Sequence, residues 1–195
     1  MGMPAHLHEG TRTVKALSIR QPWLWAILDI PESDCPKRVE NRKGTAFHYR
    51  GPVLLHASLG GTRLEYTVGI GGIMRARIDH QHTASPSMDG NMPVYQALPR
   101  GCYLGIARIV DVVMHPPAFV RGALTSGYCI AGQLGLKLAD VRKLPRVDAP
   151  GSLGLYNVEH TPGQVGRRPM WVNFGEHRDA YAAAWAELSA KGGAT

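Results

Sequence analysis

Charged and polar side chains concentrate in three short segments near the start of the chain, each beside an apolar stretch. The segments are SIRQPW at 18–23, KRVENR at 37–42 and RGPVLLHAS at 50–58. An ionisable side chain drawn into a fold must be paired or left in water, so an ordinary core needs few such groups. The three segments therefore predict one shared cleft. Its candidate catalytic residues are Lys37, Glu40 and His56, and its candidate contact residues are Arg20, Gln21, Trp23, Arg42 and Ser58.

Arg20 and Gln21 follow a predicted strand and precede a predicted helix, where free backbone N–H groups favour an anion and an arginine fork suits a phosphate. The alternative is a salt bridge from Arg20 to Glu40 that ties two strands together. Trp23 could stack on a base, but its helical spacing with Ile27 also favours core packing. Both interpretations stay open for each residue.

Lys37 is the preferred catalytic candidate. Partial burial beside other cations lowers the pKa of a lysine and frees its amine to act as a base or to activate water. Glu40 opposes this use, because a neighbouring carboxylate keeps the lysine protonated unless the carboxylate itself takes the proton. Lys37 and Glu40 are therefore candidates for proton transfer as a pair.

His56 and Ser58 stand two residues apart in a predicted strand, which places both side chains on one face. A nucleophilic serine and histidine would also need a third group and an oxyanion site, and nothing nearby in sequence supplies them. The sequence favours a buried, hydrogen-bonded His56, with a proton donor or a contact to a base edge as the alternative.

The 195 residues suit one domain with elaborations, and 22 Lys and Arg against 15 Asp and Glu give a net charge of +7. This balance favours an anionic partner, although a solvated basic rim has the same composition. The three cysteines show no CxxC spacing, so neither a disulfide framework nor a metal site is indicated, and no cofactor is implied. Without a membrane-length apolar run or a signal-peptide core, we expect a cytoplasmic protein with no membrane partner.

Apolar patterning predicts strands over residues 14–19, 37–42, 53–58, 102–114, 128–138, 152–158 and 170–174, with helices over 22–30 and 177–189. Thr62 and Glu65 form a capping box that starts another helix, which should turn Leu64, Val68 and Ile78 inward. Glycines at 69, 71 and 72 mean that this helix breaks or that something packs tightly against it.

The mixture of short strands and few helices indicates an α+β fold with a small, mostly antiparallel barrel or a strongly curled sheet. Residues 1–13 are expected to be a disordered tail and residues 81–100 a flexible insertion. A doubly wound fold is the rival, but the absence of G-x-G-x-x-G and of a regular alternation of strand and helix argues against a dinucleotide site.

The segments ALSIRQPW at 16–23, K-x-x-E-N-R at 37–42 and RGPVLLHAS at 50–58 resemble an ASCH domain, a member of the PUA-like β-barrel superfamily. Later segments agree, namely GCYLGIA at 101–107, LADVRKLP at 138–145 and GSLGLY at 151–156. The resemblance covers residues 14–158 and implies a PUA-like barrel. Leu136 and Tyr156 depart from the family's usual aromatic positions. Residues 159–195 are then a C-terminal extension whose helix packs on the barrel.

ASCH domains are associated with RNA or DNA binding, with coactivator-like roles and, in some branches, with ribonuclease activity or amide hydrolysis of N4-acylated cytidines. The amidohydrolase branch has threonine where this chain has Glu40, while Lys37 and Arg42 match it. The resemblance and the basic cleft together favour binding of single-stranded RNA, another single-stranded nucleic acid or a nucleoside ligand, with Arg and Lys on phosphate and Glu40 accepting from a base amino group.

The second interpretation is a metal-independent hydrolase that acts on RNA or on N4-acylated cytidine. The third is a protein-interaction module in transcriptional regulation, with a protein partner on the basic face or on the helix around Trp185.

Overall fold

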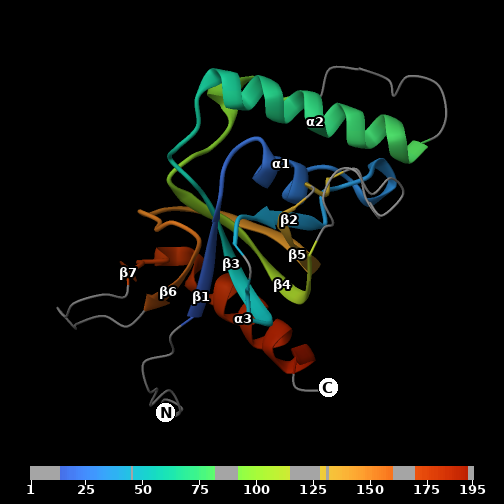
Figure 1. The fold of residues 1–195 in the computed structure, drawn as a ribbon. Coiled ribbons are helices and arrows are strands. Elements are labelled where there is room, and N and C mark those ends of the chain that lie inside the picture. Colours follow the sequence, from blue (N-terminus) through green and yellow to red (C-terminus); the bar gives the residue numbers. More distant parts are fainter. Residues whose placement is uncertain are drawn as a thin grey trace, which may run out of the picture.

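The computed structural model describes residues 14–44, 46–81, 92–114, 128–130, 132–159 and 170–192, and Figure 1 shows one sheet with helices at both of its faces. The strands are β1 (Val14–Ile19), β2 (Val39–Arg42), β3 (Gly51–Ala57), β4 (Cys102–Met114), β5 (Leu134–Asp148), β6 (Leu155–Glu159) and β7 (Met170–Trp171). The helices are α1 (Trp23–Leu28), α2 (Arg63–Gln81) and α3 (Arg178–Gly192), with 3₁₀ turns at Glu32–Asp34, Tyr95–Ala97 and Gly175–His177. The α+β class is confirmed.

The sheet is mixed and has the strand order β2-β5-β4-β3-β1-β6-β7. β1 runs parallel to β3 and β6 parallel to β7, while the other four pairs are antiparallel. Register shifts interrupt the long β4–β5 pair, and irregularities of this kind bend a strand and increase its twist. Within the described residues, the edge strands β2 and β7 do not pair, so the sheet is not closed into a barrel there.

Two apolar clusters lie on the opposite faces of the sheet, because alternate residues of a strand point to opposite sides. Leu17 of β1 and Leu55 of β3 join the cluster that contains Leu24 and Ile27 of α1. The other cluster contains Ala16 and Leu54 of the same strands together with residues of α3. The α1 face carries the candidate site, because β2 follows α1 directly.

Helix α2 runs unbroken through its glycines, because two of them are contact points with the start of α1. A Cβ at Gly69 would lie 2.7 Å from Pro22 Cδ, and a Cβ at Gly72 would lie 3.0 Å from Trp23 Cη2. Nothing lies within 4 Å of a Cβ at Gly71. The prediction that something packs tightly against these glycines is confirmed, and Figure 1 shows α2 lying across α1.

The predicted capping box is also confirmed at the start of α2. The Thr62 backbone N–H donates to Glu65 Oε2 at 2.8 Å, and the Glu65 N–H donates to Thr62 Oγ1 at 3.1 Å. The prediction that Leu64, Val68 and Ile78 face inward is wrong, since they are 73%, 66% and 48% exposed. The helix instead buries a narrow face of small and branched residues, which are Gly69, Ile73 and Ala76.

Helix α3 covers the face of the sheet opposite α1, as expected for the C-terminal extension. Tyr181 and Leu188 are buried among residues of β3 and β4, and Trp185 packs beside them. The strand predicted over 128–138 is wrong at both ends, because β5 begins at Leu134 and continues to Asp148. Its polar, proline-containing second half hides the strand from a search for apolar runs.

Part of the predicted insertion and the whole predicted tail lie outside the described residues, namely 82–91 and 1–13. Residues 92–100 are described and include a 3₁₀ turn and the buried Leu98. Among the helices that the structure describes, none is long and apolar enough to cross a membrane.

Candidate functional site

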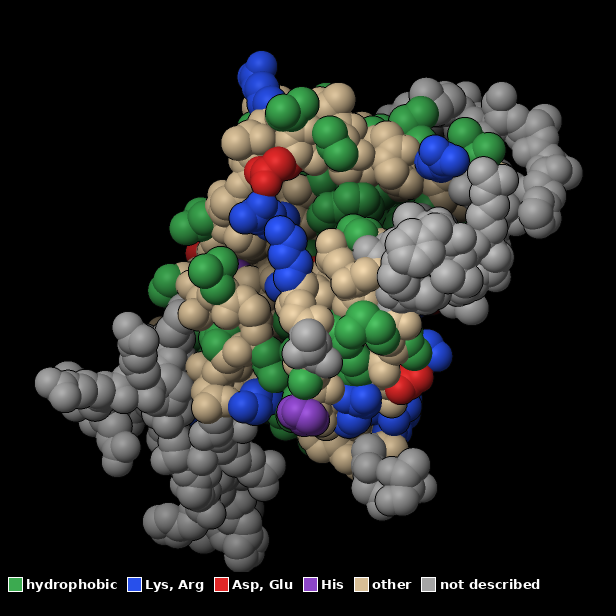
Figure 2. All heavy atoms as spheres, in the orientation of Figure 1, with side chains coloured by type: hydrophobic (Ala, Val, Ile, Leu, Met, Phe, Trp, Pro, Cys, Tyr) green, Lys and Arg blue, Asp and Glu red, His purple; other side chains and the backbone are tan. Residues whose placement is uncertain are grey.

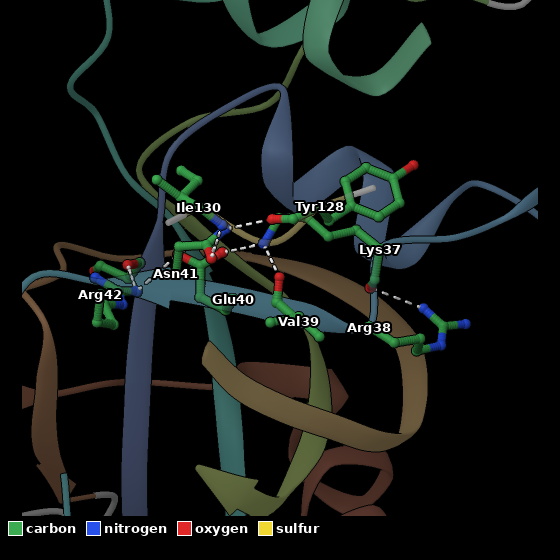
Figure 3. Close-up of polar contacts among 9 residues, drawn as sticks. Lys37, Arg38, Val39, Glu40, Asn41, Arg42, Tyr128 and Ile130 are labelled. Atoms are coloured by element: carbon green, nitrogen blue, oxygen red, sulfur yellow. Dashed lines mark hydrogen bonds and ion pairs between the residues drawn. The ribbon is translucent and has the colours of Figure 1, made fainter. Parts of the chain in front are cut away.

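Lys37, Glu40 and Arg42 come together beneath α1 as a buried ionic network (Figure 3). Lys37 Nζ donates to Glu40 Oε2 at 2.6 Å and also to the backbone carbonyl of Val39. Glu40 Oε1 lies 3.3 Å from Arg42 Nη2, which donates to the Ser18 carbonyl at 2.7 Å. The side chain of Lys37 is only 2% exposed, so its amine does not reach solvent in this conformation.

Burial and pairing act in opposite directions on Lys37. Desolvation lowers the pKa of its amine, and the adjacent Glu40 carboxylate raises it, with burial the larger effect. One carboxylate lies between two cations, so Glu40 pairs with both Lys37 and Arg42, and one positive charge remains in excess when Lys37 is protonated. In the described conformation the network is therefore a closed cluster that supports its surroundings rather than an open site.

A strap formed by residues 128–130 covers the network. Asn41 Nδ2 donates to the Tyr128 carbonyl at 2.7 Å, and the Ile130 N–H donates to Asn41 Oδ1 at 3.0 Å. The Tyr128 hydroxyl donates to the Cys35 carbonyl at 2.9 Å. Figure 3 shows Tyr128 and Ile130 lying on one side of Lys37 and Glu40, so the strap and the network form one unit.

His56 is not part of this unit, contrary to the prediction of one shared cleft. It is 1% exposed on the α3 face, where its ring contacts Tyr103 with centroids 5.0 Å apart. His56 Nε2 donates to the Ala149 carbonyl at 3.1 Å, so Nδ1 accepts from the Ser18 hydroxyl at 3.0 Å. Burial lowers the pKa of His56, and the ring is neutral near pH 7. A bulge between Leu55 and His56 accompanies this placement.

Ser58 does not form a pair with His56, because β3 ends at Ala57. Its hydroxyl accepts from the Gly60 N–H at 3.2 Å and so belongs to the turn before α2. The predicted common face of His56 and Ser58 needed a strand that continued regularly through both residues. The hydroxyl partner of His56 is Ser18.

A surface hollow of about 330 Å³ lies between the start of α1 and the first turns of α2. It is lined by the predicted contact residues Arg20, Gln21 and Trp23 and by Leu64, Glu65, Val68 and Gly69 of α2. Figure 2 shows this part of the surface, with apolar side chains beside an exposed acidic and basic pair. Three of the eight predicted site residues therefore lie at an accessible concave surface.

The rim and the floor of the hollow differ in exposure and charge. Arg20 Nη1 lies 2.5 Å from Glu65 Oε1, with both side chains about half exposed, so the predicted partner Glu40 is wrong. Gln21 is buried, and its amide joins the Trp25 N–H at 3.1 Å to the Pro99 carbonyl at 3.0 Å. Gln21 thus fixes the start of α1, whereas Arg20 is free to exchange partners.

Trp23 connects the hollow to the buried network. Its half-buried ring rests on Gly69 and Gly72 of α2, and Lys37 Nζ lies 5.9 Å from the ring centroid. This geometry allows a cation–π attraction from beneath while another part of the ring lines the hollow. Trp23 therefore packs against α2 and also lines the hollow.

Sequence reasoning missed Asn41 as the anchor of the strap and α2 as a wall of the hollow. Asn41 lies inside the predicted KRVENR segment, and its amide has both a donor and an acceptor to hold a backbone segment. Leu64 and Val68 share one helical face at a spacing of four, but the same spacing also fits a buried stripe.

No model of a known protein family matches this chain, and no curated protein matches it. Within the residues that the structure describes, no group of three or more His, Cys, Asp or Glu side chains lies close enough to hold a metal ion.

Proposed function

We propose that this chain is an ASCH-type module of the PUA-like class that binds single-stranded RNA or a nucleotide, with a base in the hollow between α1 and α2. Trp23 offers a face for stacking, and Arg20 at the rim offers a guanidinium for phosphate. The observation that carries the proposal is the juxtaposition of these two side chains at one accessible hollow of about 330 Å³.

The hollow is within the usual size range of small-molecule sites, which begins at about 300 Å³. Leu64 and Val68 give it an apolar wall that would contact a base, and Glu65 can accept from an exocyclic amino group. The Arg20–Glu65 pair is exposed, and such pairs contribute only about 0–1 kcal/mol. A phosphate can therefore replace Glu65 as the partner of Arg20 at small cost.

Lys37, Glu40 and Arg42 have a supporting role in this proposal. They hold β2 and the strap beneath Trp23, and the Glu40 carboxylate is already paired with both cations. The curled sheet with long β4 and β5 supports the PUA-like assignment, which further rests on the sequence resemblance in residues 14–158.

The test is fluorescence anisotropy with short single-stranded RNA at several salt concentrations. Arg20→Ala should weaken binding about tenfold and reduce the salt slope by about 0.7, the value expected for one lost phosphate contact on a single strand. Trp23→Leu keeps apolar contact with Gly72 but loses base stacking, which is worth about 1–3 kcal/mol. The matched control is Arg142→Ala, because Arg142 also forms an exposed pair, with Glu187 on α3.

The proposal is contradicted if the wild-type protein does not bind the RNA at low salt, or if its affinity for the RNA does not depend on salt. Equal losses from Arg20→Ala and Arg142→Ala also contradict it, since the two variants remove the same charge from different surfaces.

A second candidate is metal-independent hydrolysis of RNA or of an N4-acylated cytidine. One observation favours it: burial lowers the pKa of Lys37, whose amine is hydrogen-bonded to a carboxylate that could exchange a proton with it. A substrate would reach this pair only after the strap at 128–130 has moved. Incubation of labelled RNA and N4-acetylcytidine with the protein in EDTA tests the activity. Unchanged turnover by a folded Lys37→Met variant excludes this mechanism.

A further inference from the structure

Two arginines without acidic partners lie around a single tyrosine beside the hollow. Arg100 Cζ is 4.1 Å from the centroid of the Tyr95 ring, and Arg63 Cζ is 6.0 Å from the same centroid. Arg63 is the first residue of α2, directly before Leu64 and Glu65 of the hollow. The cluster thus continues the same surface toward the turn at Tyr95–Ala97.

The Tyr95 ring, which both arginines contact, is fixed by a hydrogen bond and a ring contact. The Tyr95 hydroxyl donates to the Gly61 carbonyl at 2.8 Å, and the edge of its ring meets Tyr66 with centroids 5.6 Å apart. Arg100 Nη1 donates to the Tyr95 carbonyl at 3.1 Å. The same loop is joined to the hollow, since Gln21 Nε2 donates to the Pro99 carbonyl at 3.0 Å.

The charges of this cluster are uncompensated. Across the described part of the chain, no carboxylate lies within ion-pair distance of Arg63 or Arg100, although most other described arginines have one. Arg100 Nε is buried and has no hydrogen-bond partner among the described residues. Two cations that share one ring repel each other, so an anion placed between them relieves that repulsion and gains charge-assisted hydrogen bonds.

We propose that Arg63, Arg100 and Tyr95 form a second contact point, which takes the phosphate backbone of a nucleic-acid strand next to the nucleotide in the hollow. This inference rests on the proposed function and extends it from one nucleotide to a run of several. Grooves that bind single-stranded nucleic acids commonly contain arginine guanidinium groups beside aromatic rings. The cations bind the phosphates, and the bases stack on the rings. A ligand confined to the hollow would not use the cluster.

The experiment compares labelled RNA dinucleotides and octanucleotides by anisotropy over a range of salt. Arg63→Ala should weaken octanucleotide binding several-fold and reduce its salt slope by about 0.7, because one phosphate contact is lost. Dinucleotide binding should not change. The Arg63 side chain is exposed, and its one ring or polar contact among the described residues is with Tyr95. Its carbonyl accepts from the Thr67 hydroxyl, and Arg63→Ala keeps that bond, so the substitution leaves the fold intact.

Arg178→Ala is the matched control, because Arg178 is an exposed arginine at the start of α3 on the opposite face of the sheet. Charge reversal in Arg63→Glu should weaken octanucleotide binding more than Arg63→Ala does. Equal octanucleotide affinity and salt slope in Arg63→Ala and Arg178→Ala overturn the second contact point, and the proposed function then survives if Arg20→Ala still weakens both ligands. A wild-type protein that binds neither RNA overturns both proposals.

Discussion

The contact between α2 and α1 can be tested with three glycines of one helix. Gly69 faces Pro22, Gly72 faces Trp23 and Gly71 faces solvent. An alanine at each position adds the same methyl group to the same helix. The three variants therefore differ only in what that methyl group meets.

The magnitudes follow from these environments. Gly71→Ala should stabilise the protein by about 0.8–1 kcal/mol, the difference in helix propensity between the two residues. In Gly69→Ala the methyl carbon would lie 2.7 Å from Pro22 Cδ, far inside the optimal carbon–carbon separation of about 3.5–4.0 Å. Overpacking of this kind costs about 1–3 kcal/mol and offsets the propensity gain. Gly72→Ala should fall between them, since its methyl meets the edge of Trp23 at 3.0 Å.

Urea denaturation followed by circular dichroism measures these differences directly. Gly71→Ala should exceed Gly69→Ala in stability by roughly 1–3 kcal/mol, or about 2–4 °C in Tm for each kcal/mol in a chain of this size. Equal stability of the two variants would refute the packing of α2 on α1, and with it the wall of the hollow.

Three further predictions concern the buried polar groups. Glu40→Gln should cost about 3–5 kcal/mol because it leaves the buried Lys37 and the partly buried Arg42 without a carboxylate partner. Lys37→Met should cost less because Glu40 keeps Arg42, and urea midpoints in the reverse order contradict this prediction. His56 has a lowered pKa in the folded protein, so stability should be constant above its ordinary value near 6.5 and fall as the pH drops below it, by up to about 1.4 kcal/mol per pH unit. His56→Gln should flatten that dependence, and an unchanged slope of stability against pH would argue against a buried neutral ring. Asn41→Ala should lower the free energy of unfolding by about 1–3 kcal/mol, because it removes the hydrogen bonds that hold the strap at 128–130. The released strap should also allow faster acetylation of Lys37, detected by mass spectrometry. An unchanged acetylation rate shows that the strap does not shield Lys37.

Features of the fold that depend on residues close together in the sequence were predictable. The capping box at Thr62 and Glu65 follows from two side chains and two backbone groups within one turn, and it was found from sequence. The inward face of α2 was not found. Its burial depends on Pro22 and Trp23, which lie more than forty residues away in the chain. A stripe of apolar residues at helical spacing has the same pattern whether it faces a core or a ligand.

The sequence predicted which residues of segment 37–42 come together, but it did not predict that His56 lies on the other face of the sheet. The sequence brought Lys37, Glu40 and Arg42 together correctly, because all three lie in the short segment 37–42. Glu40 and Arg42 share a face of β2 at a spacing of two, and Lys37 precedes the strand. It did not separate them from His56, since alternation puts His56 on the face of Leu54 but does not say which helix covers that face. Nor could it show that Glu40 would pair with both Lys37 and Arg42, because pairing depends on side-chain distances that spacing alone does not set.

One wall of the accessible hollow is formed by α2, for which the sequence predicted a helix but no role in a site. Glu65 was expected to cap α2, and it does, but it also pairs with Arg20 at the rim of the hollow. One carboxylate has two roles here because each of its oxygens has its own partner.

The central claim is that a base occupies the hollow and stacks on Trp23. The most direct measurement is a titration of isotope-labelled protein with short single-stranded RNA, in which the indole N–H signals of the tryptophans are followed by NMR and Trp23 is assigned from a Trp23→Phe variant. The signal of Trp23 should shift progressively to saturation, while that of Trp185, which packs on the opposite face of the sheet, should stay in place. A saturable shift of Trp185 with no change at Trp23 would show that the RNA binds elsewhere and not on Trp23.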